Sequence, residues 1–182
     1  MKKGKVFLIL FPLFLGIGIY LLYRSKNLFY FKFFSTHPVI YEHIISLREL
    51  AWSYRKHLPL WSVYSLPDGL WLFSFGAALL VDRKFYTIHF IIFTLIYMFM
   101  MGLEFVQKYF GGHRTMLGTF DYLDIVFFTC GYMCISLISI LLHKLQKNSF
   151  FNEIHLTKKD ELIEDLKFSI IFFILGVLPS LF

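Results

Sequence analysis

Six polar side chains of this sequence, four of them carboxylates, lie beside long apolar runs. They are Asp68, Glu104, Gln107, Arg114, Asp121 and Asp124. Carboxylates can bind a cation, ligate a divalent metal or exchange protons. Next to an apolar segment such groups are costly unless they are paired, hydrated or bound to a cation. We therefore take these six residues as candidate ligand-binding residues and assign none of them a catalytic role.

Helix capping offers another explanation for three of the carboxylates. Ser65-x-x-Asp68 has the spacing of a capping box, in which two side chains satisfy free N–H groups at the start of a helix. Asp121 can likewise cap a helix that begins after it. Asp124 then lies in the first turn, where an acid complements the helix dipole. For these three residues both capping and ligand binding are open interpretations.

Glu104 is harder to explain by helix chemistry. It lies near the end of an apolar run, and at the C-terminal end of a helix the dipole disfavours a negative charge. Glu104 therefore needs a partner, and Lys108 and Arg114 are the basic residues that follow it in the sequence. We expect a specific role for Glu104 rather than simple solvation.

The composition places these residues in a membrane protein. The chain has 182 residues, of which 58% are hydrophobic and only 16% are charged, and its mean hydropathy is +0.65. Soluble globular proteins average about 25% charged residues. Because the apolar residues fall in long blocks, we expect an all-α, polytopic membrane helix bundle that forms one integral membrane domain over residues 1–182.

Five spans and one interfacial helix are predicted. The spans cover about residues 6–23, 66–81, 85–103, 124–142 and 163–182. The last one contains Pro179 and is short, so it either spans at a tilt or enters the membrane only in part. Between the first two spans, apolar residues at helical spacing predict a helix over residues 39–57. It either lies in the membrane interface or packs on the bundle as an ordinary amphipathic helix.

The lysines at the start of the chain predict the orientation. Lys2, Lys3 and Lys5 precede the first span, and basic residues favour the cytoplasmic side. In either orientation, the second and fourth spans begin on the membrane face where the third span ends. The six candidate residues therefore share one layer, which is the outer face if the N-terminus is cytoplasmic.

Several other functions have no support in the sequence. The net charge of +6 comes from basic residues that flank apolar runs, so we expect no nucleic-acid partner. Cys130 and Cys134 are four residues apart in one apolar run and are predicted to be small packing residues. His89 is expected to be a buried histidine with a satisfied ring. No zinc spacing and no catalytic triad is present, so neither a metal site nor a cofactor is predicted.

The order of the polar residues resembles the motif of the VanZ-like membrane family. The resemblance rests on Glu104-x-x-Gln107, Arg114, Asp121-x-x-Asp124 and Gly131. Upstream, the segment that begins at Leu66 is similar to that family's Asp-Lys-x-x-His-Phe-x-x-Tyr segment. It departs from that pattern in carrying Gly69 in place of the Lys and Trp71 in place of the His. The resemblance covers about residues 66–142.

This resemblance implies a multi-pass protein of the bacterial inner (cytoplasmic) membrane. It also implies a relation to a protein that lowers susceptibility to the antibiotic teicoplanin, a glycopeptide. The expected partners are then membrane lipid and a lipid-linked or glycopeptide-type ligand at the outer-face carboxylates. The mechanism does not follow from the resemblance.

The sequence is also compatible with two alternative functions. The first is a membrane enzyme that acts on a phospho- or polyprenyl-lipid, with the four carboxylates holding a divalent cation such as Mg²⁺, Ca²⁺ or Mn²⁺. The second is an accessory subunit of a membrane complex. In that case Gly131, Cys134 and Ser139 offer small packing positions to a helix of a membrane-protein partner.

Overall fold

The computed structural model describes residues 3–24, 29–83, 85–112 and 119–147, together with Lys167 and Ile170. Within these ranges the chain is all-α. The predicted fifth span, over residues 163–182, lies outside the described residues except for those two positions. Arg114 also lies outside them.

The described helices follow one another without any strand among them. They are α1 (Lys3–Tyr23), α2 (Phe29–Phe34), α3 (Pro38–Ser53), a short 3-10 helix (Arg55–His57), α4 (Leu60–Tyr64), α5 (Leu66–Leu80), α6 (Tyr86–Phe110) and α7 (Tyr122–Lys147). Within the described ranges, three helices are long and apolar enough to cross a membrane, namely α1, α6 and α7. Helix α5 is equally apolar but has only 15 residues, or about 22 Å at 1.5 Å per residue.

Two helices extend beyond the predicted spans. Helix α6 continues past the predicted end at residue 103 to Phe110, and α7 continues past residue 142 to Lys147. The reason is that hydropathy locates an apolar segment, whereas backbone hydrogen bonds extend a helix into the polar residues that flank it. Glu104 therefore lies within α6 and not at its C-terminal end.

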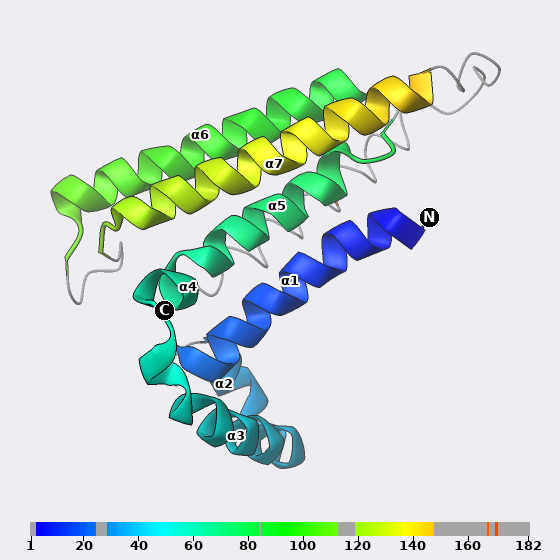
Figure 1. Cartoon of the computed structure of the whole chain (residues 1–182). Helices are drawn as coiled ribbons and strands as arrows, with labels where there is room; N and C mark the ends of the chain where they lie inside the picture. The colour runs from blue at the N-terminus through cyan, green and yellow to red at the C-terminus, as the bar shows by residue number, and fades with distance from the viewer. Residues whose placement is uncertain are drawn as a thin grey trace.

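Helix α5 is the centre of the bundle, with most of its contacts to α1 and α7 (Figure 1). The approach of α5 to α7 is very close at Gly69 and Gly131. A Cβ atom at Gly69 would collide with the Phe127 carbonyl, and one at Gly131 would collide with the Gly69 carbonyl. Small residues permit such close approach of membrane helices. Gly131 thus packs against α5 within the chain.

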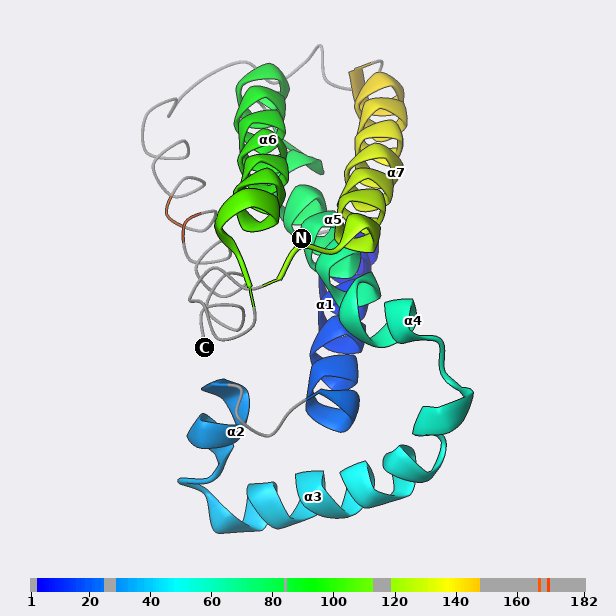
Figure 2. The same cartoon turned by 90° about the vertical axis from the view of Figure 1, so that its left-hand side faces the viewer.

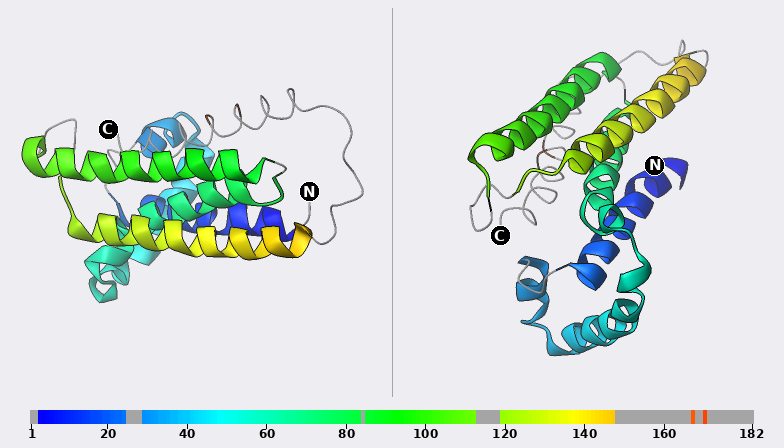
Figure 3. Two further views of the ribbon diagram at one scale, coloured as in Figure 1. Left: turned by 90° about the horizontal axis from the view of Figure 1, so that it is seen from above. Right: turned by 60° about the vertical axis from the view of Figure 1, so that its left-hand side comes forward.

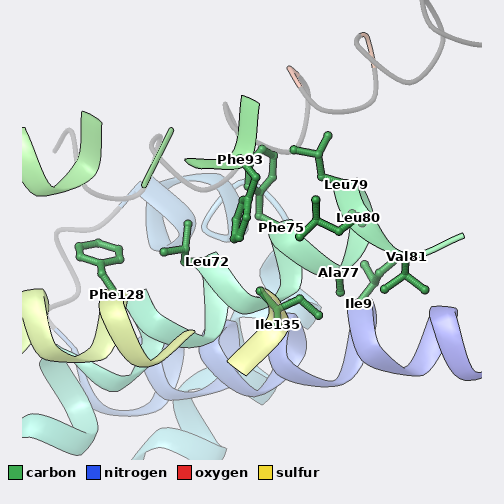
Figure 4. Close-up of a cluster of buried hydrophobic side chains, with 11 residues drawn as sticks. Ile9, Leu72, Phe75, Ala77, Leu79, Leu80, Val81, Phe93, Phe128 and Ile135 are labelled. Carbon is green, nitrogen blue, oxygen red and sulfur yellow. The ribbon is translucent and has the colours of Figure 1, made fainter. Parts of the chain in front are cut away.

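The buried apolar core surrounds α5 (Figure 4). Leu72, Phe75 and Leu79 of α5 are fully buried against Phe93 of α6 and Ile135 of α7. A Cβ atom at position 76 of α5 would overlap both of those last two side chains. The core therefore fixes which face of α5 points towards α6 and α7.

Helices α6 and α7 lie side by side in both views of Figure 3 and are joined by side-chain hydrogen bonds. Their hydroxyl groups pair across the interface. The pairs are Tyr86 with Ser139 at 3.0 Å, Thr94 with Tyr132 at 3.0 Å, and Tyr97 with Thr129 at 2.9 Å. Such bonds hold membrane helices together where water is absent. The Ser139 hydroxyl is therefore also engaged in a contact within the chain.

The two cysteines are exposed in the structure, whereas His89 is buried. Cys130 and Cys134 are free and exposed on α7, so the prediction that they are packing residues is wrong within the described bundle. His89 is buried, and its Nδ1 lies 2.9 Å from the Phe85 carbonyl. This confirms that His89 is buried and that one of its ring nitrogens is hydrogen-bonded.

Helix α3 runs crosswise beneath the bundle in Figure 2. Arg48 attaches it, because this buried guanidinium donates a hydrogen bond of 2.9 Å to the Leu21 carbonyl near the end of α1. The same guanidinium lies against the rings of Phe31 and Trp52, 5.2 and 4.7 Å from their centroids. The predicted helix over residues 39–57 is thus confirmed in most of its length, although the α-helix ends at Ser53.

Candidate functional site

Three helices bring the four candidate carboxylates to one end of the bundle. Asp68 lies in the first turn of α5, Glu104 in the last part of α6, and Asp121 and Asp124 at the start of α7. Each of these four groups is within electrostatic range of others in the set. We call Asp68, Glu104, Asp121 and Asp124 the acidic cluster. Their convergence follows from the alternating direction of α5, α6 and α7, as the sequence predicted.

Glu104 is the most buried member of the acidic cluster. Its side chain is 5% exposed, and its carboxylate receives a hydrogen bond from the backbone N–H of Asp121. The Oε2 atom has no hydrogen-bond partner in the described part of the chain. A buried polar atom without a partner costs about 1–3 kcal/mol, and more if it is charged.

Lys108 does not neutralise Glu104, contrary to one of the two predicted pairings. Its side chain is exposed, and the ammonium lies 5.6 Å from the centroid of the Phe120 ring. The other predicted partner, Arg114, falls outside the described residues. Gln107 is half-buried on α6, about one turn beyond Glu104.

Asp68 is held by the first helix rather than by a capping box. The buried Tyr20 hydroxyl donates a hydrogen bond of 2.8 Å to Asp68 Oδ1. Ser65, at the start of α5, makes no side-chain capping bond, so the capping interpretation is wrong for this pair. The Ser65 hydroxyl instead lies near the Asp124 carboxylate, although the two do not form a complete hydrogen bond.

Asp121 and Asp124 differ in their bonding. Asp121 Oδ1 accepts a hydrogen bond of 2.9 Å from the Leu123 N–H, which confirms the predicted cap at the start of α7. Asp124 lies in the first turn, as the capping interpretation expected, but its buried Oδ1 has no partner within the described ranges. Helix capping therefore explains the hydrogen bonding of Asp121 but not that of Asp124.

Arg24 contributes positive charge to the site, although it was not among the six residues that the sequence predicted. It lies within electrostatic range of Asp68 and Asp124. Its guanidinium lies over the Tyr20 ring, 4.3 Å from the centroid, and donates hydrogen bonds to the Val63 and Tyr64 carbonyls. Arg24 ends the first span on the membrane face of Asp68, so topology could have identified it. A basic residue at a span end is, however, also the usual mark of snorkelling.

Among the described residues of the site, negative groups outnumber positive ones. Four carboxylates lie near one guanidinium, that of Arg24, which already donates to two backbone carbonyls. No group of three His, Cys, Asp or Glu side chains among the described residues is arranged to hold a metal ion. The arrangement offers unpaired acceptor oxygens, which match a ligand that carries N–H donors and positive charge.

No family model matches this chain, and neither does any curated protein or any solved structure.

Proposed function

We propose that this chain is a VanZ-like multi-pass protein of the bacterial inner membrane, with its N-terminus in the cytoplasm. Its acidic cluster binds the cationic group of an envelope lipid or of a glycopeptide-type ligand on the outer face. The observation that carries the proposal is the Oε2 atom of Glu104, which is buried among other carboxylates and lacks a partner in the described part of the chain. No reaction is assigned to the site.

A primary ammonium group fits the acidic cluster best. It has three N–H donors and no acceptor, whereas an ionised carboxylate only accepts. Binding would satisfy Glu104 Oε2 and Asp124 Oδ1, the two buried acceptors that have no described partner. It would also reduce the repulsion between like charges. An isolated buried charge is destabilising by several kcal/mol, so this relief is a substantial source of affinity.

The level of the site suits an amphipathic ligand. Glu104 lies six residues before the end of α6, and Asp124 lies in the first turn of α7. Both helices are candidate membrane spans. A cationic head group at this level would have its apolar part beside the exposed apolar side chains of the same helices, such as Phe105 and Tyr109. A ligand with a cationic head group and an apolar part would therefore gain binding energy both from the carboxylates and from contact with the membrane.

Helix α3 supports a membrane interface at the same end. Its exposed apolar side chains recur at helical spacing and form one stripe, made by Val39, Ile40, Leu47 and Leu50. The helix lies crosswise to the spans and is fixed to the end of α1 by Arg48. We infer that α3 lies in the interface with this stripe towards the lipid.

The decisive experiment compares Glu104→Gln with Glu42→Gln. Both changes remove one negative charge, but Glu42 is exposed on α3 and away from the acidic cluster. Purified protein is titrated with fluorescent teicoplanin in detergent, and cells that express each variant are tested for teicoplanin tolerance. We expect Glu104→Gln to weaken binding at least about tenfold, equal to about 1.4 kcal/mol, and to remove tolerance. We expect Glu42→Gln to behave as the unchanged protein. Equal binding by both variants, with normal membrane insertion, would show that the proposal is wrong.

A further inference from the structure

The end of the bundle opposite to the acidic cluster carries basic residues. There α1 begins and α5 and α7 end, on the side of the molecule that is at the right in Figure 1. Lys5 is at the beginning of the candidate span of α1, and Arg83 comes three residues before that of α6. Both cations are thus at the boundary of the apolar segments, where lipid head groups lie.

Lys5 and Arg83 converge on the last turn of α5. Lys5 Nζ donates a hydrogen bond of 2.6 Å to the Val81 carbonyl, and Arg83 Nη2 donates one of 2.9 Å to the Ala78 carbonyl. Both side chains are half-buried, and the two positive charges are within electrostatic range of each other. Their mutual repulsion is offset in part by Asp82, which interacts with Lys5.

Helix capping explains only part of this arrangement. Cations are favourable near a helix C-terminus, because they complement the dipole and satisfy free carbonyls. One cation would serve that purpose, yet two are gathered here. Lys5 uses one of its three N–H donors on Val81, and no other hydrogen bond of its ammonium is formed within the described ranges. Burial also lowers the pKa of the Arg83 guanidinium, so its charged form lacks part of the hydration it would have in water.

The short length of α5 leaves this cation pair set back from the end of the neighbouring helix. Gly76 of α5 packs on Ile135 of α7, and the two helices run in the same direction. Helix α5 ends four residues later at Leu80, whereas α7 continues for twelve residues to Lys147. The difference of eight residues corresponds to about 12 Å of helix. An anion at the end of α5 would thus be flanked by α7.

We propose that Lys5 and Arg83 bind the phosphate group of an anionic phospholipid in the leaflet on their side of the membrane. A phosphate oxygen accepts from an ammonium and a guanidinium together. The position at the boundary of the apolar segments favours a lipid phosphate over free phosphate, because the acyl chains can lie along the exposed surfaces of the spans. This site is distinct from the acidic cluster and does not depend on the ligand bound there.

Thermal unfolding of the full-length protein in mild detergent tests the proposal. The probes are dioctanoyl phosphatidic acid, dioctanoylglycerol, which lacks only the phosphate, and inorganic phosphate. A ligand that binds the folded state raises its Tm. We expect phosphatidic acid to raise the Tm by a few degrees and the other two probes to leave it unchanged. An equal rise with dioctanoylglycerol, or a rise produced by inorganic phosphate alone, would overturn the lipid-phosphate assignment.

Variants show whether the effect belongs to this cation pair. Lys5→Gln and Arg83→Gln should each reduce the rise caused by phosphatidic acid by at least half, whereas Lys5→Arg should retain it. Lys144→Gln is the matched control, because Lys144 is exposed near the same end of α7. An equal loss in the Lys144 variant would indicate diffuse attraction to positive charge and would contradict a specific site.

Discussion

The charged side chains at the two ends of the helix bundle differ in their hydrogen bonding. At the basic end, Lys5 and Arg83 each donate to a carbonyl of the last turn of α5. At the acidic end, Glu104 Oε2 and Asp124 Oδ1 are buried and find no donor in the described part of the chain. A helix C-terminus supplies free acceptors to cations, whereas the acidic end must obtain its missing donors from elsewhere. These two buried carboxylate oxygens are the feature on which the proposed ligand site rests.

The largest expected effect comes from separating the helices that form the acidic end. Gly131→Leu places a side chain against the Gly69 carbonyl, and overpacking of this kind costs about 1–3 kcal/mol or more. We expect loss of folded protein after solubilisation, measured by size-exclusion chromatography and thermal unfolding. Gly102→Leu is the control, since a Cβ atom there has nothing within 4 Å. Equal stability of the two variants would contradict the close packing of α5 on α7.

Neutralising one charge at each end should change stability in opposite directions. Lys5→Gln loses a charged hydrogen bond to the Val81 carbonyl and should lower the unfolding free energy by about 2 kcal/mol. Glu104→Gln replaces a carboxylate by an amide that can donate to its acidic neighbours, and it should raise the unfolding free energy by about 1 kcal/mol in the absence of ligand. Denaturation in detergent measures both. A loss of stability in both variants would remove the contrast between the ends.

The smallest effect concerns the contact between α1 and the acidic cluster. Tyr20→Phe keeps the ring over which Arg24 lies but removes the 2.8 Å hydrogen bond to Asp68. We expect a loss of about 1 kcal/mol in unfolding free energy. Tyr109→Phe serves as the control, because Tyr109 is 75% exposed. If both variants unfold at the same temperature, α1 contributes little to holding the cluster.

The sequence predicted the main features of the fold for physical reasons that can be traced. Long apolar runs mark α1, α6 and α7, and the alternation of helix direction places Asp68, Glu104 and Asp124 at one end. The exact ends of α6 and α7 could not be predicted, because the polar residues that follow an apolar run suit either a continued helix or a loop. That uncertainty led to the wrong position of Glu104 within its helix.

The partners of the candidate residues were less predictable. Tyr20 and Arg24 contact the acidic cluster across more than 40 positions of sequence, at Asp68, and no local pattern marks such pairs. The Ser65-x-x-Asp68 spacing predicted a capping box, but the Tyr20 hydroxyl competes successfully for the same carboxylate. Contacts between distant helices depend on how each helix is rotated about its axis, which hydropathy does not determine.

The glycine contacts of α5 have a consequence for binding. Gly69 fits against the backbone of α7, and Gly76 fits against Phe93 and Ile135. These close contacts fit α5 tightly against its neighbours and place Asp68, the residue before Gly69, near the other carboxylates. If the proposed ligand binds at the acidic end, these groups are already in place, and little conformational entropy would be lost on binding.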